Sequence, residues 1–211
     1  MIYREISDSE IEVLRGKVSS EMSEKRYLHT LAVEDMARRL SELYCPEKKS
    51  KLRAAALLHD MTKELSYEEH IAIFKEHGES LLPEDLRAPK TFHARSAAIL
   101  ISMIYPEFSD IEIINAVRYH TTGCASMTLF EKIIYLADYI DETRKYDECV
   151  KLRNMFWDAQ PQKMEMAERL EHLDNVLLEA LNMSIDSLID DGKIISCDTV
   201  AARNSLILNK K

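Results

Sequence analysis

The chain has 211 residues, of which 46% are hydrophobic, and a formal net charge of −9 at pH 7. This length supports one sizeable core rather than two independent domains, and the acidic balance argues against a protein that binds nucleic-acid polymers or anionic membranes through a basic face. A phosphorylated small substrate would therefore need cations or a metal placed locally.

Cysteine usage and the hydrophobic runs predict a cytoplasmic protein. The four cysteines show neither the CxxC spacing of a metal or redox motif nor a disulfide-rich composition, so we expect reduced thiols. No apolar run reaches the length of a membrane span, and the first ten residues lack the hydrophobic segment of a signal peptide. We therefore expect no membrane partner and no targeting segment.

Turn-forming residues are scarce, which predicts an all-α fold. Four glycines and five prolines leave little turn chemistry for β-hairpins, and helix formers fill the segments between them. Capping boxes, in which Ser or Thr precedes Glu by three residues, mark helix starts at Ser9, Ser66, Ser109 and Thr128. The predicted helices cover 9–20, 23–44, 46–59, 67–77, 91–105, 109–119, 128–142, a short segment from 147, 161–190 and 200–208.

The second predicted helix brings the first candidate site residues. Its apolar stripe is predicted from residues at helical spacing, namely Leu28, Leu31, Ala32, Met36, Leu40 and Leu43. Arg26 and His29 lie one turn apart and share a face. Taken singly, His29 would be a core or boundary histidine and Arg26 a surface charge, so their role depends on what else converges on them.

The stretch 53–63, RAAALLHDMTK, is the one around which we expect the fold to be organised. An apolar helix runs directly into His59 and Asp60, where the chain should be buried. A buried carboxylate needs a cation or a hydrogen-bonding partner, although a solvated polar helix end would fit the same residues. Lys63, three residues after Asp60, can turn toward the same cleft or lie on the surface.

Two further helices and the segment between them follow. We interpret His70 and His77 of the first as surface residues among charges. The segment 78–90 contains two prolines and is predicted to be a loop that could serve as a cleft rim or a lid. The next helix, 91–105, carries His93 in its first turn.

His120 ends the following predicted helix and precedes the turn Thr121, Thr122, Gly123. Glycine suits a left-handed helix cap, and hydroxyls beside a histidine can reach the oxygen atoms of a ligand. Asp138 lies in the apolar stretch of the next helix, so it is a second carboxylate that needs a partner.

The C-terminal segment is predicted to be mainly structural. The helix over 161–190 has a continuous apolar stripe, which serves either packing or the surface of a homodimer. A final helix, capped by Asp198 or Thr199, carries Arg203 and Asn204. These two residues join a site only if the tail folds back.

Six side chains form a set when they are taken together: His29, His59, Asp60, His93, His120 and Asp138. Nitrogen and oxygen donors in this mixture suit Fe, Mn or Zn better than Mg or Ca. Six ligands exceed what one catalytic metal with open positions needs, and they match two metals bridged by Asp60. The expected cofactor is therefore a pair of divalent metal ions.

These residues and the sequence motifs that contain them resemble a known family. The order of His29, then His59 with Asp60, then Asp138 resembles the HD-domain metal-dependent phosphohydrolase superfamily, and His93 and His120 are the additions of its dinuclear members. The surrounding sequence motifs are similar to those of the YqeK family: RYLHTLAV at 26–33, LLHDMTK at 57–63, YHTTG at 119–123 and IIYLADYIDETR at 133–144. The resemblance covers residues 20–150.

The resemblance implies an HD-domain helical bundle with a dinuclear metal site in its core. We expect an N-terminal helix (1–19), the HD core (20–150) and a C-terminal helical extension packed on it (151–211). The implied reaction is the symmetrical cleavage of diadenosine tetraphosphate into two ADP by a metal-bridging hydroxide, with iron favoured over Mn or Zn. The six residues above would be the metal ligands, His59, Asp60 and Lys63 the catalytic set, and the polyphosphate would lie among Arg26, Lys63, Thr121, Thr122 and Arg144.

Two departures bear on the substrate fit. Ala94 and Arg95 follow the third histidine, where the family usually has Gly, and Asp141 and Glu142 stand where it usually has Glu-Pro. Neither removes a proposed ligand. The alternatives are an HD nucleotidase or a hydrolase of another signalling nucleotide, a non-catalytic nucleotide-binding regulator, and a helical domain with scattered histidines. A metal-binding assay and analysis of the products distinguish them.

Overall fold

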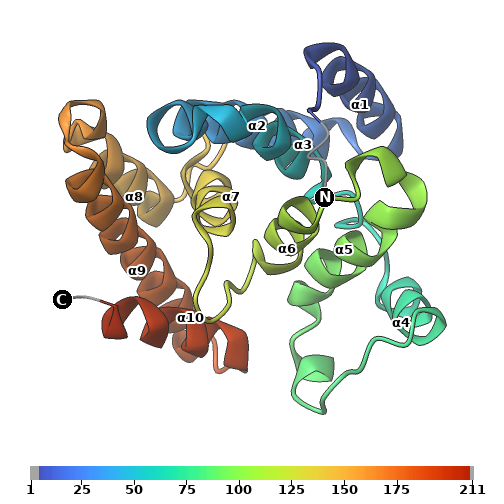
Figure 1. Ribbon diagram of the computed structural model, residues 1–211. Coiled ribbons are helices and arrows are strands. Elements are labelled where there is room, and N and C mark those ends of the chain that lie inside the picture. Colours follow the sequence, from blue (N-terminus) through green and yellow to red (C-terminus); the bar gives the residue numbers. More distant parts are fainter. Residues whose placement is uncertain (1–4, 210–211) are drawn as a thin grey trace.

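The computed structural model describes residues 5–209 and, over that range, consists of helices and turns without strands (Figure 1). The all-α prediction is therefore confirmed. The helices are α1 (Asp8–Glu21), α2 (Glu24–Tyr44), α3 (Lys49–Leu58), α4 (Tyr67–Glu76), α5 (Phe92–Ile104), α6 (Ile111–Tyr119), α7 (Leu129–Ile140), α8 (Asp147–Asp158), α9 (Met166–Asp190) and α10 (Cys197–Leu208). The segments predicted as 1–19 and 151–211 include residues 1–4 and 210–211, which lie outside the described part of the chain.

Capping chemistry sets the helix starts, but not always at the predicted residue. The predicted boxes of α4 and α7 are present, at Ser66 and Thr128. In α1 the box is formed by Ser7 with Glu10 and not by Ser9, because two hydroxyls two residues apart offer overlapping starts. The earlier start adds the backbone hydrogen bond from Ile11 N to Ser7 O at 3.2 Å.

Two other helices also use a different cap. Asp110 and not Ser109 caps α6, since the hydroxyl of Ser109 is hydrogen bonded to a neighbouring serine at 2.8 Å. In α10 the cap is Ser196, whose hydroxyl accepts a hydrogen bond from the backbone of Asp198. Asp198 and Thr199, predicted as caps, therefore lie in the first turn of the helix.

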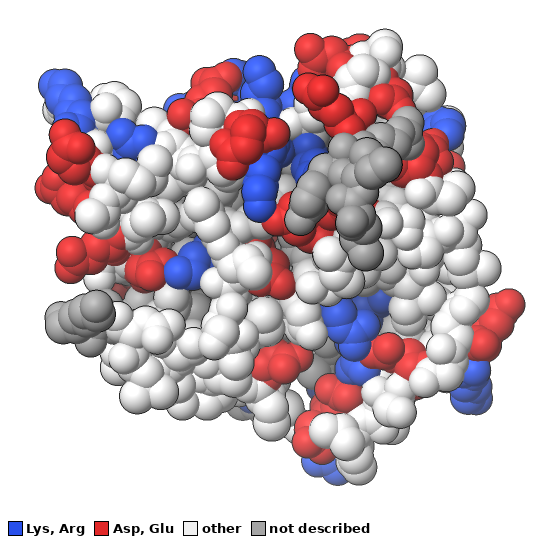
Figure 2. Space-filling view, in the orientation of Figure 1, with Lys and Arg blue, Asp and Glu red and all other residues white. Residues whose placement is uncertain are grey.

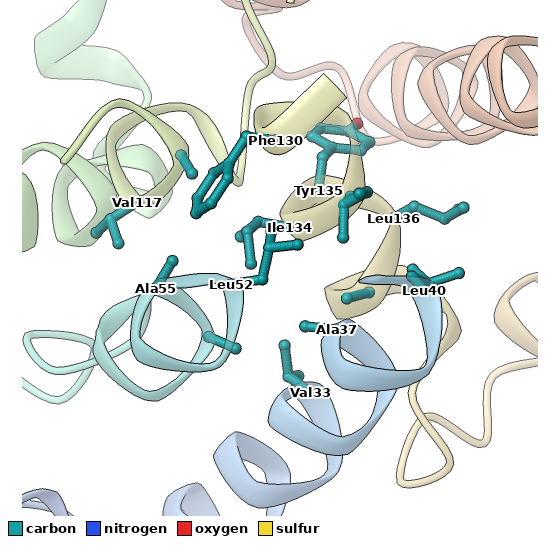
Figure 3. Packing of buried hydrophobic residues seen from close by; sticks show 14 of the residues in the cluster. Val33, Ala37, Leu40, Leu52, Ala55, Val117, Phe130, Ile134, Tyr135 and Leu136 are labelled. Carbon is teal, nitrogen blue, oxygen red and sulfur yellow. The ribbon is translucent and has the colours of Figure 1, made fainter. Parts of the chain in front are cut away.

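α3 is the central helix of the bundle. Residues 52–58 are buried on every side, because α3 packs against α1, α2, α6 and α7. A helix that is apolar nearly all round is typical of such a position. Figure 3 shows Val33 of α2 and Ile134 of α7 in the cluster around Leu52 of α3. The helix therefore carries His59, which follows its last residue, into the interior.

The buried face of α2 is rotated from the predicted stripe. Leu28 is 55% exposed, whereas the helix buries Thr30, Val33, Met36, Ala37, Leu40 and Tyr44. Contacts with α3 and α7 decide which of two adjacent faces turns inward. In this orientation Arg26 and His29 both face Asp60 at the end of α3.

α4 packs on α5, and one of its histidines differs from prediction. His70, predicted to lie on the surface, is buried with Nδ1 2.9 Å from Ser96 Oγ. Its ring also contacts the rings of Phe74 and Phe92. The charged neighbours of His70 in the sequence do not reveal its apolar surroundings, which Phe74 of α4 and Phe92 of α5 supply. His77 is exposed, as predicted.

The segment 78–90 is more structured than the predicted loop. It contains two short 3-10 turns, Asp85–Arg87 and Pro89–Thr91. Glu79 accepts hydrogen bonds from Arg95 at 2.7 Å and from Arg118 at 2.5 Å, which ties the segment to α5 and α6. Its service as a lid stays a prediction.

α8, α9 and α10 extend the bundle from α7 (Figure 1). The predicted stripe of α9 is buried at Leu173, Val176, Leu177, Ala180 and Leu181. Ser205 Oγ accepts a hydrogen bond from Ser126 N at 3.0 Å, and Arg203 Nε donates to Asn182 Oδ1 at 2.7 Å. The tail therefore folds back, with Arg203 held between α9 and α10 and Asn204 exposed.

The distribution of charged residues on the surface agrees with the acidic net charge of the sequence. On the face shown in Figure 2, acidic and basic residues are interspersed, and no basic area spans the face. Among the described residues, no helix combines the length and the apolar composition that crossing a membrane requires. The four cysteines, all within the described range, are free.

The close approach of α10 to the turn after α6 predicts a stability difference between two glycines. Gly123 has φ 66°, and a Cβ there would lie 2.9 Å from Ala202 Cβ. Gly192 has φ 62° with nothing within 4 Å. We expect Gly123→Ala to lower the free energy of unfolding by about 2–5 kcal/mol, the sum of left-handed strain and overpacking, and Gly192→Ala by about 1–2 kcal/mol. Urea unfolding measures both, and equal losses would contradict a tight contact.

Candidate metal centre

The ends and faces of five helices bring the six candidate ligands together. His29 comes from α2, His93 from the first turn of α5 and Asp138 from α7, while the other three follow the last residues of α3 and α6. Five of the six are buried and His29 is nearly so, with 12% of its side chain exposed. These are His29, His59, Asp60, His93, His120 and Asp138.

Asp60 stands between two sets of imidazole nitrogens. Its Oδ2 lies 3.4 Å from His59 Nε2 and 3.7 Å from His29 Nε2. Its Oδ1 lies 3.3 Å from His93 Nε2 and 3.7 Å from His120 Nε2. One carboxylate therefore presents a different oxygen to each set.

Spacings between donor atoms of the cluster suit a metal ion. His29 Nε2 lies 3.0 Å from Asp138 Oδ1, and His93 Nε2 lies 3.0 Å from His120 Nε2. Donor atoms within 4.8 Å of one another form two overlapping triads. The triads are His29, His59 and Asp138, and His59, Asp60 and His120.

Hydrogen bonds on the far side of two rings orient their inner nitrogens toward the cluster. Nδ1 of His59 lies 2.6 Å from the carbonyl of Ala56, and Nδ1 of His120 lies 2.7 Å from that of Val117. A carbonyl only accepts, so the proton is on Nδ1 and the lone pair is on Nε2.

Orphaned polar atoms point to the same conclusion. His59 Nε2 and Asp60 Oδ1 are buried without a hydrogen-bond partner, and His29 Nε2 has only its ion-pair contact with Asp138. Buried polar atoms almost always have a hydrogen-bond partner, so several neighbouring nitrogen and oxygen atoms that lack one require an explanation. Because imidazole nitrogen and carboxylate oxygen are the usual ligands of Fe, Mn and Zn, the residues fit a divalent metal.

The carboxylates are held in the ionised form that a metal needs. Burial alone would raise the pKa of Asp60, but its contacts with the imidazoles of His59, His120 and His93 hold that pKa well below its usual value. Burial would likewise raise the pKa of Asp138, yet Arg144 and His29 hold it well below its usual value.

The imidazoles divide into two groups by protonation. Burial, reinforced by nearby positive charge, holds the pKa of His93 well below its usual value, and burial also lowers the pKa of His120. Burial alone would lower the pKa of His29, but contacts with Asp138 and Asp141 raise it to about 9. In the metal-free protein His29 is therefore protonated at neutral pH, whereas His93 and His120 are neutral.

Three basic side chains, predicted to hold the polyphosphate, surround this cluster. Arg26 Nη1 donates to Asp60 Oδ2 at 2.6 Å. Arg144 is hydrogen bonded to a carboxylate oxygen of Asp138 and donates from Nε to its carbonyl at 2.7 Å. Lys63 Nζ lies 3.0 Å from His93 Nε2, and burial lowers the pKa of this lysine.

The two predicted hydroxyls have different positions. Thr121 Oγ1 lies 3.2 Å from His93 Nε2 and so belongs to the cluster. Thr122 is buried, and its hydroxyl donates to the carbonyl of Gly123 at 2.9 Å. The structure therefore does not bring the hydroxyl of Thr122 to the cluster, because the turn that ends at Gly123 uses it locally.

Two cavities adjoin the cluster. One, of about 810 Å³, is lined by Arg26, His29, Arg144 and Tyr146 among others. The second, of about 530 Å³, is lined by Lys63, His93, Lys90 and Tyr67 among others. The histidine in each wall belongs to a different set, so each cavity opens beside one of the two histidine sets around Asp60.

Asp141 and Thr143 are site residues that the sequence-based prediction missed. α7 ends at Ile140, two residues earlier than predicted, and the turn that follows places both side chains beside His29. Asp141 Oδ2 lies 3.5 Å and Thr143 Oγ1 3.2 Å from His29 Nδ1. An aspartate directly after an apolar helix, the signal that identified Asp60, also marks Asp141.

Comparison with known proteins adds a second line of evidence. The HD domain family model matches residues 26–143. The chain is 30% identical over 203 residues to a protein of Halalkalibacterium halodurans named "Bis(5'-nucleosyl)-tetraphosphatase, symmetrical", covering 93% of this chain and 99% of that protein. It is 34% identical over 140 residues to the Bacillus subtilis protein of the same name, covering 65% of this chain and 73% of that one.

A solved structure is also similar over nearly the whole chain. It is the structure of a "predicted HD superfamily hydrolase involved in NAD metabolism" from Clostridium acetobutylicum. Its sequence is 34% identical, its TM-score is 0.82, and the match covers 94% of this chain and 97% of that one. The helical arrangement around the cluster is thus shared with a solved protein.

Proposed function

The chain belongs to the HD domain family, and we propose that it is the hydrolase that cleaves diadenosine tetraphosphate symmetrically into two ADP. The observation that carries this proposal is Asp60, which presents one oxygen to each of two histidine sets. The relatives named for this activity support the choice of substrate.

Two divalent cations are the proposed cofactor, with iron favoured and Mn or Zn as alternatives. One set would comprise His29, His59 and Asp138, the other His93 and His120, and Asp60 would be shared by both. Bound there, the cations would supply Lewis acidity that lowers the pKa of a water molecule and offsets charge on the phosphoryl oxygens.

Arg26, Lys63 and Arg144 would hold the polyphosphate. In a chain with a net charge of −9, three cations around one buried cluster are a local exception that suits an anionic ligand. The guanidinium groups can hold phosphate oxygens by paired hydrogen bonds, and the ammonium acts as a point charge. Arg26 Nε is buried without a partner, so one donor stays available. The hydroxyl of Thr121 would add a neutral contact.

The two cavities suit a substrate that extends in both directions from the bond that breaks. Symmetrical cleavage of a tetraphosphate leaves an equal half on either side of the central bridge oxygen. Volumes of about 810 and 530 Å³ lie within the range of about 300–1,000 Å³ that is usual for small-molecule sites. A polyphosphate that crosses the cluster would then have room for a nucleoside at each end.

Product analysis tests the proposal. Protein loaded with Fe²⁺, Mn²⁺ or Zn²⁺ is incubated with diadenosine tetraphosphate, and the products are separated by anion exchange. Two ADP per substrate are expected, with no hydrolysis in excess chelator. AMP with ATP, or no turnover with any of the three metals, would overturn it. Faster cleavage of a mononucleotide under the same conditions would favour the nucleotidase alternative.

A further inference from the structure

The turn after α7 contains a buried carboxylate that none of the proposed ligand sets uses. The side chain of Asp141 is 0% exposed, and its Oδ2 has no hydrogen bond although it lies 3.5 Å from both His29 Nδ1 and Arg144 Nε. Its Oδ1 accepts a hydrogen bond from Thr143 N at 2.8 Å and another from the hydroxyl of the same threonine. Burial of a charge is costly, so this placement calls for a function.

Thr143 connects this carboxylate to His29. Its hydroxyl oxygen lies 3.2 Å from His29 Nδ1. A hydroxyl has a single proton, which is donated here to Asp141, so the threonine oxygen can only accept from the ring. His29 Nδ1 must therefore carry the N–H, and Nε2 is the nitrogen that faces Asp60 and Asp138.

The position of His29 explains why the acceptor for its Nδ1 proton must come from another element. His59 and His120 follow the last residues of α3 and α6, where free carbonyls accept their Nδ1 protons. His29 lies inside α2, where the carbonyls of the helix already accept backbone hydrogen bonds. An acceptor for its Nδ1 must come from another element, and the turn after α7 provides it.

We propose that Asp141 is a positioning residue of the metal centre, which acts together with Thr143 to fix the ring orientation and the Nδ1-protonated tautomer of His29. This inference rests on the ligand role of His29 in the proposed function. Arg153 of α8 keeps the turn in place, because it donates hydrogen bonds to the carbonyls of Ile140 at 2.8 Å and Arg144 at 2.9 Å.

Two pairs of variants test the inference through metal affinity. Asp141→Asn replaces a charged acceptor by an amide, and Asp141→Glu keeps the carboxylate. Thr143→Val removes the hydroxyl from an exposed residue, and Thr143→Ser keeps it. Mn²⁺ titration of the full-length protein should show binding at one site weakened by about 10- to 100-fold in Asp141→Asn, with Thr143→Val toward the lower end. Asp141→Glu should recover part of the loss and Thr143→Ser most of it.

A second readout reports the ring itself. In the Zn²⁺-loaded protein, long-range ¹⁵N NMR of histidine should show His29 protonated at Nδ1 and bound through Nε2, and Asp141→Asn should disturb this pattern. Binding through Nδ1, or parent affinity in both Asp141→Asn and Thr143→Val, would overturn the inference. His29→Ala distinguishes a failure of the proposed function from a failure of this inference. If His29→Ala still binds two cations, His29 is not a ligand. If His29→Ala loses one cation while Asp141→Asn keeps parent affinity, only the positioning role of Asp141 is refuted.

Discussion

Asp60→Asn is expected to reduce metal binding from two cations per chain to at most one and to lower kcat/KM by more than about a hundredfold. The carboxylate faces His29 and His59 with one oxygen and His93 and His120 with the other. An amide has a single carbonyl oxygen, so only one set keeps its ligand. Loss of an outer partner of a ligand already costs about 10- to 100-fold, and a shared ligand should cost more.

Metal analysis after gel filtration, together with steady-state kinetics, measures both effects. Asp35→Asn is the matched control, because Asp35 lies on the exposed side of α2 and is paired with Arg38, away from the cluster. It should bind two cations and keep parent kinetics. Two cations in Asp60→Asn would refute the bridging position, even if activity were lost.

Removal of metal is expected to abolish hydrolysis and to lower the thermal midpoint by about 5–10 °C. A ligand present at a hundred times its dissociation constant stabilises the folded state by about 2.7 kcal/mol. In a chain of this size each kcal/mol shifts the midpoint by about 2–4 °C. The effect should be large because the metal-free centre leaves His59 Nε2 and Asp60 Oδ1 buried without hydrogen-bond partners.

Thermal unfolding with excess Mn²⁺ and with EDTA measures the shift, and renewed addition of Mn²⁺ should restore both midpoint and activity. Asp60→Asn serves as the internal comparison and should show a smaller difference between the two conditions. Activity that survives exhaustive chelation would contradict a metal-dependent reaction. An unchanged midpoint would contradict a site built into the core.

Some features were predictable because they follow from short-range chemistry. Scarce glycine and proline with helical spacing of apolar residues predict helices, and ten of them are present in the described range. Cap positions were less predictable, since overlapping hydroxyls such as Ser7 and Ser9 offer equivalent local starts. Backbone hydrogen bonds and neighbouring side chains then decide between them.

The environment of single polar residues was harder to predict. His70 has charged neighbours in sequence, yet α5 covers it with Ser96 and Phe92. Thr122 stands beside His120 in sequence, yet its hydroxyl serves the turn at Gly123. Each outcome depends on an element distant in the chain or on local turn geometry, which side-chain spacing does not encode.

The sequence by itself determined the all-helical class, because glycine and proline are scarce and apolar residues recur at helical spacing. It also indicated the kinds of metal-ligating side chain, because an apolar helix that runs into His-Asp predicts a buried polar site. Only the tertiary structure decided that Asp60 divides its two oxygens between separate histidine sets and that Asp141 reaches His29 through Thr143. Those relations depend on how α2, α3 and α7 are rotated against one another, and packing of the whole core determines that rotation.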